Sequence, residues 1–157
     1  MRIVITSDHA AMDLKQAMVE HLKSAGMDIT DCNPQEDTTL EYPDHALSAC
    51  KMLTEKKYNY AILLCGTGAG MCMAANKLRG IRAVVCSEPY TARLAREHNN
   101  ANVLCIGARI VGHELALNIA ESFLSAKFLG GRHTERVNKI MKIEDLGGSA
   151  PNTPANS

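Results

Sequence analysis

The sequence predicts an α/β protein built on a parallel sheet, and two observations carry that prediction. Five short apolar runs alternate with helical stretches along the 157-residue chain. Most of these runs are continuously apolar, as expected for strands that are covered on both faces. Alternation of strands and helices in this way is typical of doubly wound sheets with right-handed crossovers.

The five expected strands span residues 2–6, 27–31, 60–65, 81–85 and 103–106. Helical patterns lie between them, near 11–24, 43–57, 70–78, 89–98 and 112–126, and Gly26 is expected to end the first. A sixth, more polar helix is expected from about 134 to 144, with no strand before it. The elements predict a Rossmann-like three-layer αβα sandwich with a five-stranded parallel sheet. The polarity of the extra C-terminal helix suggests that it packs on something other than its own sheet, a partner subunit being one candidate.

Residues 1–146 are expected to form a single domain, because a chain of 157 residues can bury one proper core. The segment 147–157 is rich in Gly, Pro and Asn and poor in apolar residues. We expect this tail to be disordered.

Composition excludes several classes of partner. Lys+Arg and Asp+Glu number 17 each, so no net charge favours nucleic acid or an anionic membrane. The chain has no Trp and only two Phe, which argues against a base-stacking surface. No secretory signal and no apolar run of about 20 residues is found. The six cysteines form no C-x-x-C pair, which favours a reducing, cytoplasmic location over a zinc site.

A glycine-rich loop, Cys65-Gly66-Thr67-Gly68-Ala69-Gly70, follows the third expected strand. Ligands of open α/β sheets bind beyond the carboxyl ends of the strands, where this loop lies. Its glycines allow a ligand to approach backbone N–H groups, which also favour a thiolate and a developing oxyanion. Thr67 adds a hydroxyl donor. A tight turn beside an inert, buried cysteine is the plainer interpretation, and it suits Cys86 and Cys105 better than Cys65.

Dinucleotide binding is a second interpretation of the same loop. The glycine spacing does not fit G-x-G-x-x-G, and the loop follows the third strand instead of the first. Glu88 does lie at a suitable distance downstream for a ribose contact, which keeps this alternative open. The chain has no G-K-[ST] sequence, so a P-loop is excluded.

Two further clusters contain histidine. Asp8 and His9 follow the first strand, where they could bind sugar hydroxyls, cap the next helix or, least plausibly for lack of a third ligand, bind metal. The segment His98-Asn99-Asn100-Ala101-Asn102 ends the fourth helix and leads into the fifth strand. It suits a helix C-cap and equally a proton-transfer site with a hydroxyl-binding amide.

Arginines form the last cluster. Arg132 and Arg136 lie four residues apart at the start of the last helix, and Arg109 follows the fifth strand. A pair of guanidinium groups on one face fits a phosphate, although a solvated basic face would show the same spacing.

Taken together, the clusters resemble the family of ribose-5-phosphate isomerase B, which includes the galactose-6-phosphate isomerase subunits. The resemblance spans roughly residues 1–145 in register. It is carried by Ser7-Asp8-His9, Tyr42-Pro43-Asp44, Cys65-Gly66-Thr67-Gly68-Ala69-Gly70, Ala74-Ala75-Asn76-Lys77, Gly80-Ile81-Arg82-Ala83, His98-Asn99-Asn100-Ala101-Asn102 and Gly131-Arg132-His133.

The resemblance implies interconversion of D-ribose 5-phosphate and D-ribulose 5-phosphate without metal or organic cofactor. It implies that Cys65 moves the proton through a cis-enediolate, that His98 opens the sugar ring, and that Thr67 stabilises the enediolate oxygen. The N–H groups of Gly66, Gly68, Ala69 and Gly70 would share that last task. The remaining implied substrate contacts are hydroxyl or wall contacts from Asp8, Tyr42 and Asn99 and phosphate contacts from His9, Arg109, Arg132 and Arg136.

In this family the site lies between two subunits, which implies a homodimer with shared sites, with pairing into a tetramer left open. Some relatives use a glutamate after the glycine loop as the base, but this chain has Met71 there. It carries both Cys65 and His98, which favours one self-sufficient chain over two different ones. The alternatives are an isomerase of allose 6-phosphate or galactose 6-phosphate, and a non-catalytic module that binds a sugar phosphate or nucleotide.

Overall fold

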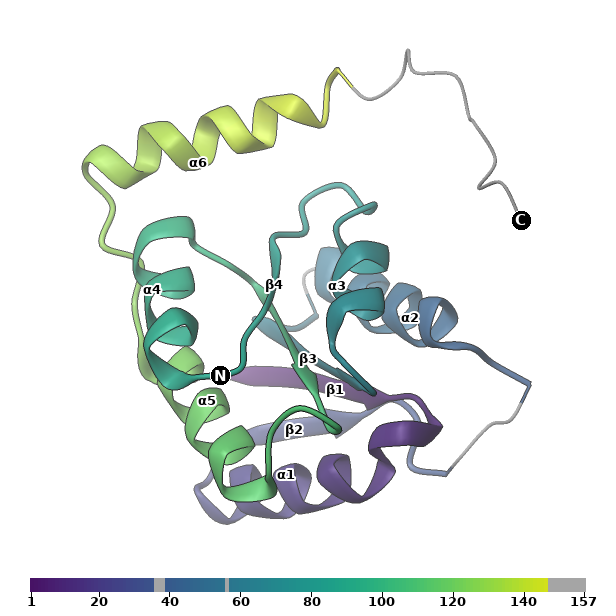
Figure 1. Cartoon of the computed structure of the whole chain (residues 1–157). Helices are drawn as coiled ribbons and strands as arrows, with labels where there is room; N and C mark the ends of the chain where they lie inside the picture. The colour runs from purple at the N-terminus through teal and green to yellow at the C-terminus, as the bar shows by residue number, and fades with distance from the viewer. Residues whose placement is uncertain (36–38, 56, 147–157) are drawn as a thin grey trace.

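The computed structural model describes residues 1–35, 39–55 and 57–146. Within these residues, five strands alternate with helices, and at the C-terminal end two of the six α-helices follow one another (Figure 1). The strands are β1 (Arg2–Ser7), β2 (Asp28–Asp31), β3 (Tyr60–Cys65), β4 (Ala83–Val85) and β5 (Val103–Gly107). The helices are the 3-10 turn η1 (His9–Ala11), α1 (Met12–Ser24), α2 (Tyr42–Thr54), α3 (Ala69–Ala75), α4 (Pro89–Asn99), α5 (His113–Ser125) and α6 (Arg132–Ile143).

All strand pairs are parallel, and the strand order is β2-β1-β3-β5-β4. The chain leaves β1 towards β2 on one side and then returns past β1 to form β3 on the other. The carboxyl ends of β1 and β3 therefore flank a topological switch point, which is where open α/β sheets bind their ligands. Ser7 lies opposite Leu64 at this point, so Asp8 and Cys65 follow from neighbouring strand ends.

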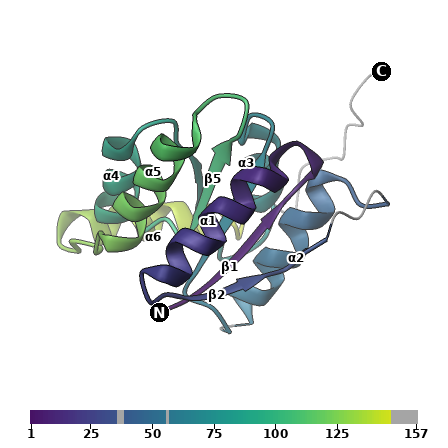
Figure 2. The same cartoon turned by 90° about the horizontal axis from the view of Figure 1, so that it is seen from below.

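Successive residues of β3 pack alternately into two separate hydrophobic cores, one on each face of the sheet. Ile62 and Leu64 pack with α1, α4 and α5, whereas Ala61, Leu63 and Cys65 pack with α2 and α3. The two helix layers are visible on opposite sides of the sheet (Figure 2). This confirms the predicted Rossmann-like αβα sandwich, and it places the Cys65 side chain on the α2–α3 face.

Helix α2 and strand β4 begin at other residues than predicted. In each case a side chain binds the backbone at the start of the element. Helix α2 begins at Tyr42 because Glu41 and Asp44 form a capping box, with Pro43 in the first turn. Strand β4 begins at Ala83 and not at 81, as predicted. The Asn76 side chain binds the free edge of β4 at Ala83. Its Oδ1 atom accepts the Ala83 N–H at 2.8 Å, and its Nδ2 group donates to the Ala83 carbonyl at 3.0 Å.

Helix α6 lies as an arm beside the body of the protein (Figure 1). It begins at Arg132, two positions before the predicted start, because Gly130 and Gly131 take positive φ angles of 65° and 56° and turn the chain early. His133 and Val137 are its buried residues, while Ile143 is 62% exposed. The predicted reach of α6 to a partner subunit stays a prediction, and the predicted disordered tail lies outside the described residues.

No helix in the described ranges is long and apolar enough to cross a membrane.

Candidate active site

Cys65 is the last residue of β3, and its side chain is 5% exposed. The N–H of Gly68 donates a hydrogen bond to the Cys65 Sγ atom at 3.1 Å. Gly68 reaches this position with a φ of +80°, where a β-carbon would also lie only 2.8 Å from Cγ2 of Val85. The loop thus needs glycine here in order to direct an N–H at the sulfur, and this hydrogen bond fixes the Cys65 side chain at the end of β3.

Thr67 crosses directly over the end of β5. A β-carbon on Gly107 would lie 2.6 Å from the carbonyl carbon of Thr67, so the two backbones approach as closely as glycine allows. The N–H groups of Ala108 and Arg109 donate to the carbonyls of Cys65 and Gly66 at 2.9 and 3.0 Å. The end of β5 is therefore the support on which the loop rests.

We expect Gly107→Ala to lower the free energy of unfolding by about 1–3 kcal/mol, because the added methyl group meets backbone atoms that cannot move aside. Gly70→Ala is the matched control, since its β-carbon would meet the Tyr42 ring at 2.8 Å and that ring is partly exposed and free to swing out. Urea denaturation of both variants measures the difference. Equal losses of stability would contradict the proposed close support of Thr67.

Two N–H groups of the loop donate hydrogen bonds to side chains of the loop itself. Gly68 donates to the Cys65 sulfur, and Ala69 donates to Oγ1 of Thr67 at 3.3 Å. Because the Thr67 oxygen accepts this bond, its hydroxyl hydrogen stays available to a ligand. Thr67 is exposed, so its hydroxyl can reach a substrate oxygen. The Gly68 and Ala69 N–H groups are less available for the predicted oxyanion role.

Asp8, His9 and Tyr42 lie around the same edge. The Asp8 N–H donates to the Leu64 carbonyl at 3.1 Å, which joins this loop to the end of β3. Its carboxylate accepts from the Ala10 N–H at 2.9 Å and caps η1, so the capping interpretation is correct. His9 is exposed. Tyr42 packs its ring against Gly70, and so forms a wall beside the loop.

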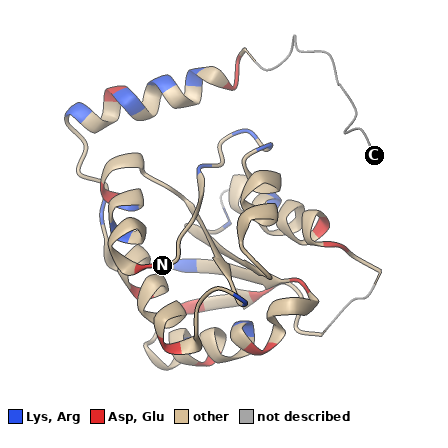
Figure 3. Ribbon diagram, viewed as in Figure 1, with Lys and Arg blue, Asp and Glu red and all other residues tan. Residues whose placement is uncertain are grey.

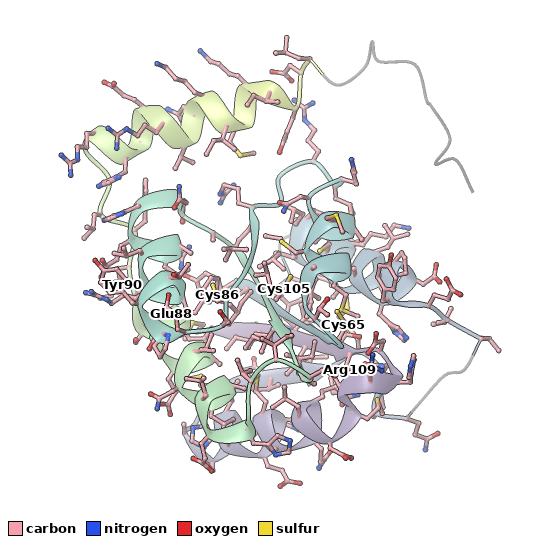
Figure 4. All side chains as sticks on the ribbon, in the orientation of Figure 1. Cys65, Cys86, Glu88, Tyr90, Cys105 and Arg109 are labelled. Carbon is pink, nitrogen blue, oxygen red and sulfur yellow. The ribbon has the colours of Figure 1, made fainter. Side chains whose placement is uncertain are left out.

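The Arg109 side chain lies over Gly66. A β-carbon on Gly66 would be 3.4 Å from Nη1 of Arg109, so the guanidinium group extends across the loop that follows Cys65. Cys65 and Arg109 are found at the same end of the sheet (Figure 4). The carboxyl edge thus brings together the predicted site residues Cys65, Gly66, Thr67, Gly68, Ala69, Gly70, Asp8, His9, Tyr42 and Arg109.

His98, Asn99, Arg132 and Arg136 lie at the other end of the sheet. Helix α4 begins after β4 at the carboxyl edge and runs back to the amino edge, where it leads into β5. A strand of five or six residues spans roughly 17–20 Å, and this separates His98 from the Cys65 loop of the same chain. The predicted site is therefore divided within one chain into a carboxyl-edge cluster and an amino-edge cluster.

The amino-edge cluster is organised by two stacked imidazoles. The His98 and His133 rings are parallel, at an interplanar angle of 4° and a centroid distance of 4.3 Å. Burial lowers the pKa of His133, and the neighbouring His98, Arg132 and Arg136 lower it further. Arg132 and Arg136 are exposed on the basic helix α6 (Figure 3). The C-cap interpretation of the segment 98–102 is confirmed at Asn100, which caps α4 with a φ of +48°, while His98 lies in the last turn of the helix.

The alternative ribose contact of Glu88 is not supported. The Glu88 carboxylate accepts from the N–H groups of Tyr90 and Thr91, both at 2.6 Å, and so caps α4. These bonds direct both carboxylate oxygens at the backbone of the first turn of α4. Glu88 is a helix cap, as its place before Pro89 at the start of α4 requires (Figure 4).

A cavity of about 860 Å³ lies at the amino edge beneath the last turns of α6. Its buried guanidinium group, Arg96, donates to the Tyr60 hydroxyl and to the Ala101 carbonyl, both at 2.6 Å. Arg79, also in its wall, pairs with Glu144 and Asp145. Because these cations are engaged by the protein itself and ligands bind at the opposite edge of such sheets, we place the candidate site at the carboxyl edge.

Other cysteines differ sharply in acidity. Burial raises the pKa of Cys50 and of Cys86 to about 12, and it raises that of Cys105 well above its usual value. This supports the interpretation of Cys86 and Cys105 as structural. A hydrogen bond from Cys105 lowers the pKa of the half-buried Cys72 to about 7.

Alkylation by iodoacetamide should therefore separate these thiols. We expect modification of Cys72 to rise with a midpoint near pH 7, because only the thiolate reacts, while Cys50 and Cys86 stay unmodified at pH 8. Peptide mass spectrometry across pH 5–9 measures each site. Modification of Cys72 and Cys86 at the same rate would contradict the hydrogen-bond explanation.

Several residues that organise the site were not predicted from the sequence. Gly107 supports Thr67, and His133 stacks on His98. Gly107 had a detectable signal, since glycine at the end of a buried strand marks a close backbone approach. No signal in the sequence indicates the stacking of His133 on His98, because this contact depends on how α6 packs against α4.

The fold and the site define a doubly wound α/β protein with a hydrogen-bonded cysteine at its topological switch point. The chain matches the model of the ribose/galactose isomerase family over residues 3–140. It is 43% identical to ribose-5-phosphate isomerase B of Escherichia coli, over 91% of this chain and 96% of that protein. It is 42% identical to D-erythrulose-4-phosphate isomerase of Pectobacterium atrosepticum, over 89% and 93% of the two chains.

Solved structures agree with this match. Ribose-5-phosphate isomerase B of Clostridium thermocellum superposes with a TM-score of 0.90 at 43% identity, covering 93% of this chain and 99% of that one. The enzyme of Mycoplasma genitalium with bound ribulose 5-phosphate gives a TM-score of 0.85 at 42% identity, covering 92% and 96%. The chain belongs to the ribose/galactose isomerase family.

Proposed function

We propose that this protein interconverts D-ribose 5-phosphate and D-ribulose 5-phosphate. The observation that carries the proposal is the Cys65 thiol at the switch point, held by the Gly68 N–H at 3.1 Å. The 43% identity to ribose-5-phosphate isomerase B and the similarity to the Mycoplasma genitalium complex support the choice of a pentose phosphate.

Cys65 acts as the base of the isomerisation. Its thiolate removes the proton from C2 of the open-chain aldose, which gives a cis-enediolate with negative charge on O1. The thiol then returns the proton to C1, and the proton of the C2 hydroxyl passes to O1, which leaves the C2 carbonyl of the ketose. One base serves both carbons because they are adjacent on one face of the enediolate. Thr67 donates its hydroxyl hydrogen to the oxygen on which negative charge develops, so its interaction is strongest in the transition state.

The ring-opening group and two of the phosphate-binding arginines come from a partner subunit. The carboxyl-edge cluster contains the base, and the amino-edge cluster of the same chain contains His98, Asn99, Arg132 and Arg136. A two-fold dimer that sets the amino edge of one chain against the carboxyl edge of the other forms two complete sites. The exposed Arg132 and Arg136 and the arm-like α6 support this arrangement. Pairing of two dimers into a tetramer is compatible with it.

The substrate then has a contact for each of its parts. His98 of one chain transfers the proton that opens the furanose ring, and Asn99 holds a hydroxyl. Asp8 of the other chain holds a further hydroxyl, and Tyr42 forms the wall. His9 and Arg109 meet Arg132 and Arg136 of the partner chain around the phosphate, whose binding orients the sugar over Cys65.

The proposed chemistry uses side chains and N–H groups alone, with neither metal nor organic cofactor. We place the enzyme in the cytoplasm, since all six cysteines are free and a reducing compartment keeps them so. Residues 1–146 would act as its single domain. Activity that survives dialysis against EDTA is the expected result.

A direct assay tests the proposed function against its alternatives. Purified protein is given ribose 5-phosphate, allose 6-phosphate, galactose 6-phosphate or D-erythrulose 4-phosphate, and product is followed by NMR. We expect the highest kcat/KM with ribose 5-phosphate. A preference for allose 6-phosphate or galactose 6-phosphate would show that the substrate is a six-carbon sugar phosphate. Turnover of none of the four would favour a non-catalytic binding module.

A further inference from the structure

The end of β1 extends past the end of the neighbouring edge strand β2. The two strands pair up to Ile5 and Asp31, and the Cys32 N–H still reaches the Ile5 carbonyl at 2.9 Å. Ser7 lies two residues further on and is completely buried. On this side of the sheet its backbone groups therefore need partners other than β2.

The Asn33 side chain supplies those partners. Its Oδ1 atom accepts from the Ser7 N–H at 3.2 Å and from the Thr6 hydroxyl at 2.8 Å. Its Nδ2 group donates to the Ser7 carbonyl at 2.7 Å. One amide thus holds both backbone groups of Ser7, as a paired strand would.

Asn33 is itself held by a buried charge. Lys15, which is 1% exposed, directs its ammonium group at the Asn33 carbonyl oxygen and lies 3.2 Å from Oδ1 of Asn33. The same ammonium group pairs with Oδ1 of Asp31 at 3.1 Å, and that oxygen also accepts the Asn33 N–H at 3.0 Å. Burying an ammonium group is costly, so its hydrogen bonds give it a defined place.

We propose that Asn33, fixed by Lys15 and Asp31, is a positioning residue of the isomerase site that acts through Asp8. Ser7 directly precedes Asp8. The Asp8 N–H is bound to the Leu64 carbonyl on the β3 side, so the Ser7-Asp8 backbone is held on both sides where it enters the site. Removing the Asn33 amide frees one side and displaces the Asp8 carboxylate. This inference rests on the proposed function.

A double-mutant cycle tests the role. We expect Asn33→Ala to lower kcat/KM for ribose 5-phosphate about 10- to 100-fold, the scale expected for a displaced substrate contact. In an Asp8→Ala background the same change should lower it less than about twofold, because the contact is already lost. In an Arg109→Ala background, Asn33→Ala should again lower kcat/KM by about 10- to 100-fold.

Asn59→Ala is the matched control. Asn59 binds the Arg2 N–H at 2.8 Å, at the other end of the same strand, and its loss should leave kcat/KM near that of the unmodified protein. If circular dichroism shows that Asn33→Ala is unfolded, Lys15→Met replaces Asn33→Ala in the cycle. This change removes the hydrogen bonds that the Lys15 ammonium group donates to Asn33.

An equal factor in the Asp8→Ala and Arg109→Ala backgrounds would overturn the inference, as would a folded Asn33→Ala variant with unchanged kcat/KM. The failure of the proposed function is a distinct result: the unmodified protein would then not turn over ribose 5-phosphate at all.

Discussion

Replacing Cys65 by alanine should lower the rate of isomerisation about 10²- to 10⁴-fold, the range that a general base contributes. The structure offers a specific reason, because the Gly68 N–H is directed at the Cys65 sulfur and Met71, the position of the alternative base, is fully buried. Binding of ribulose 5-phosphate, measured by calorimetry, should persist. The same variant should lose exchange of the C1 proton of ribulose 5-phosphate with D2O.

The control for this prediction is Cys50→Ala. Cys50 is also buried on the α2–α3 face, and burial raises its pKa to about 12, so it cannot serve as a base near neutral pH. Its replacement should affect stability and leave catalysis intact. An undiminished rate in Cys65→Ala would contradict the assignment of the base.

Replacing His98 by alanine should separate the two chemical steps. Ribose 5-phosphate has a ring to open, whereas ribulose 5-phosphate has none, since the phosphate occupies its C5 oxygen. We expect kcat/KM for ribose 5-phosphate to fall about 10²- to 10⁴-fold with the loss of this acid–base group. Exchange of the C1 proton of ribulose 5-phosphate with D2O, followed by NMR, should stay close to that of the unmodified protein.

His133→Phe provides a comparison for this variant, because a flat ring that stacks on His98 is kept while the second imidazole is removed. It should retain far more turnover of ribose 5-phosphate than His98→Ala. Loss of proton exchange in His98→Ala to the level of Cys65→Ala would show that His98 takes part in the proton transfer between carbons and not in ring opening.

Much of the fold could be predicted because its signals are local. The apolar run of β3 has the predicted bounds, since both of its faces are buried and both of its ends are marked by polar or glycine residues. The glycine at the end of α1 was also predictable: Gly26 takes a φ of +80°, which other residues rarely adopt. The carboxyl-edge cluster followed from the rule that parallel strands end together.

What escaped prediction depends on distant segments. The order of β4 and β5 in the sheet decides that Gly107 lies beneath Thr67, and no local pattern encodes that order. Asn33 follows β2 in what looks like an ordinary turn, and its amide binds Ser7 only because β2 ends early. The separation of His98 from Cys65 follows from the direction of α4, which spacing along the chain does not reveal.

Because of that separation, we propose that each site combines Cys65 of one chain with His98 of its partner. Mixing two kinds of variant subunit tests this division of the site. Cys65→Ala and His98→Ala proteins, each inactive on ribose 5-phosphate alone, are unfolded together in equal amounts and refolded. Half of the resulting dimers contain one chain of each kind, and in these one of the two sites has both residues. If the sites are shared in this way, we expect recovery of about a quarter of the activity of the unmodified protein. A mixture that stays as inactive as its parents, although mixed dimers have formed, would contradict it.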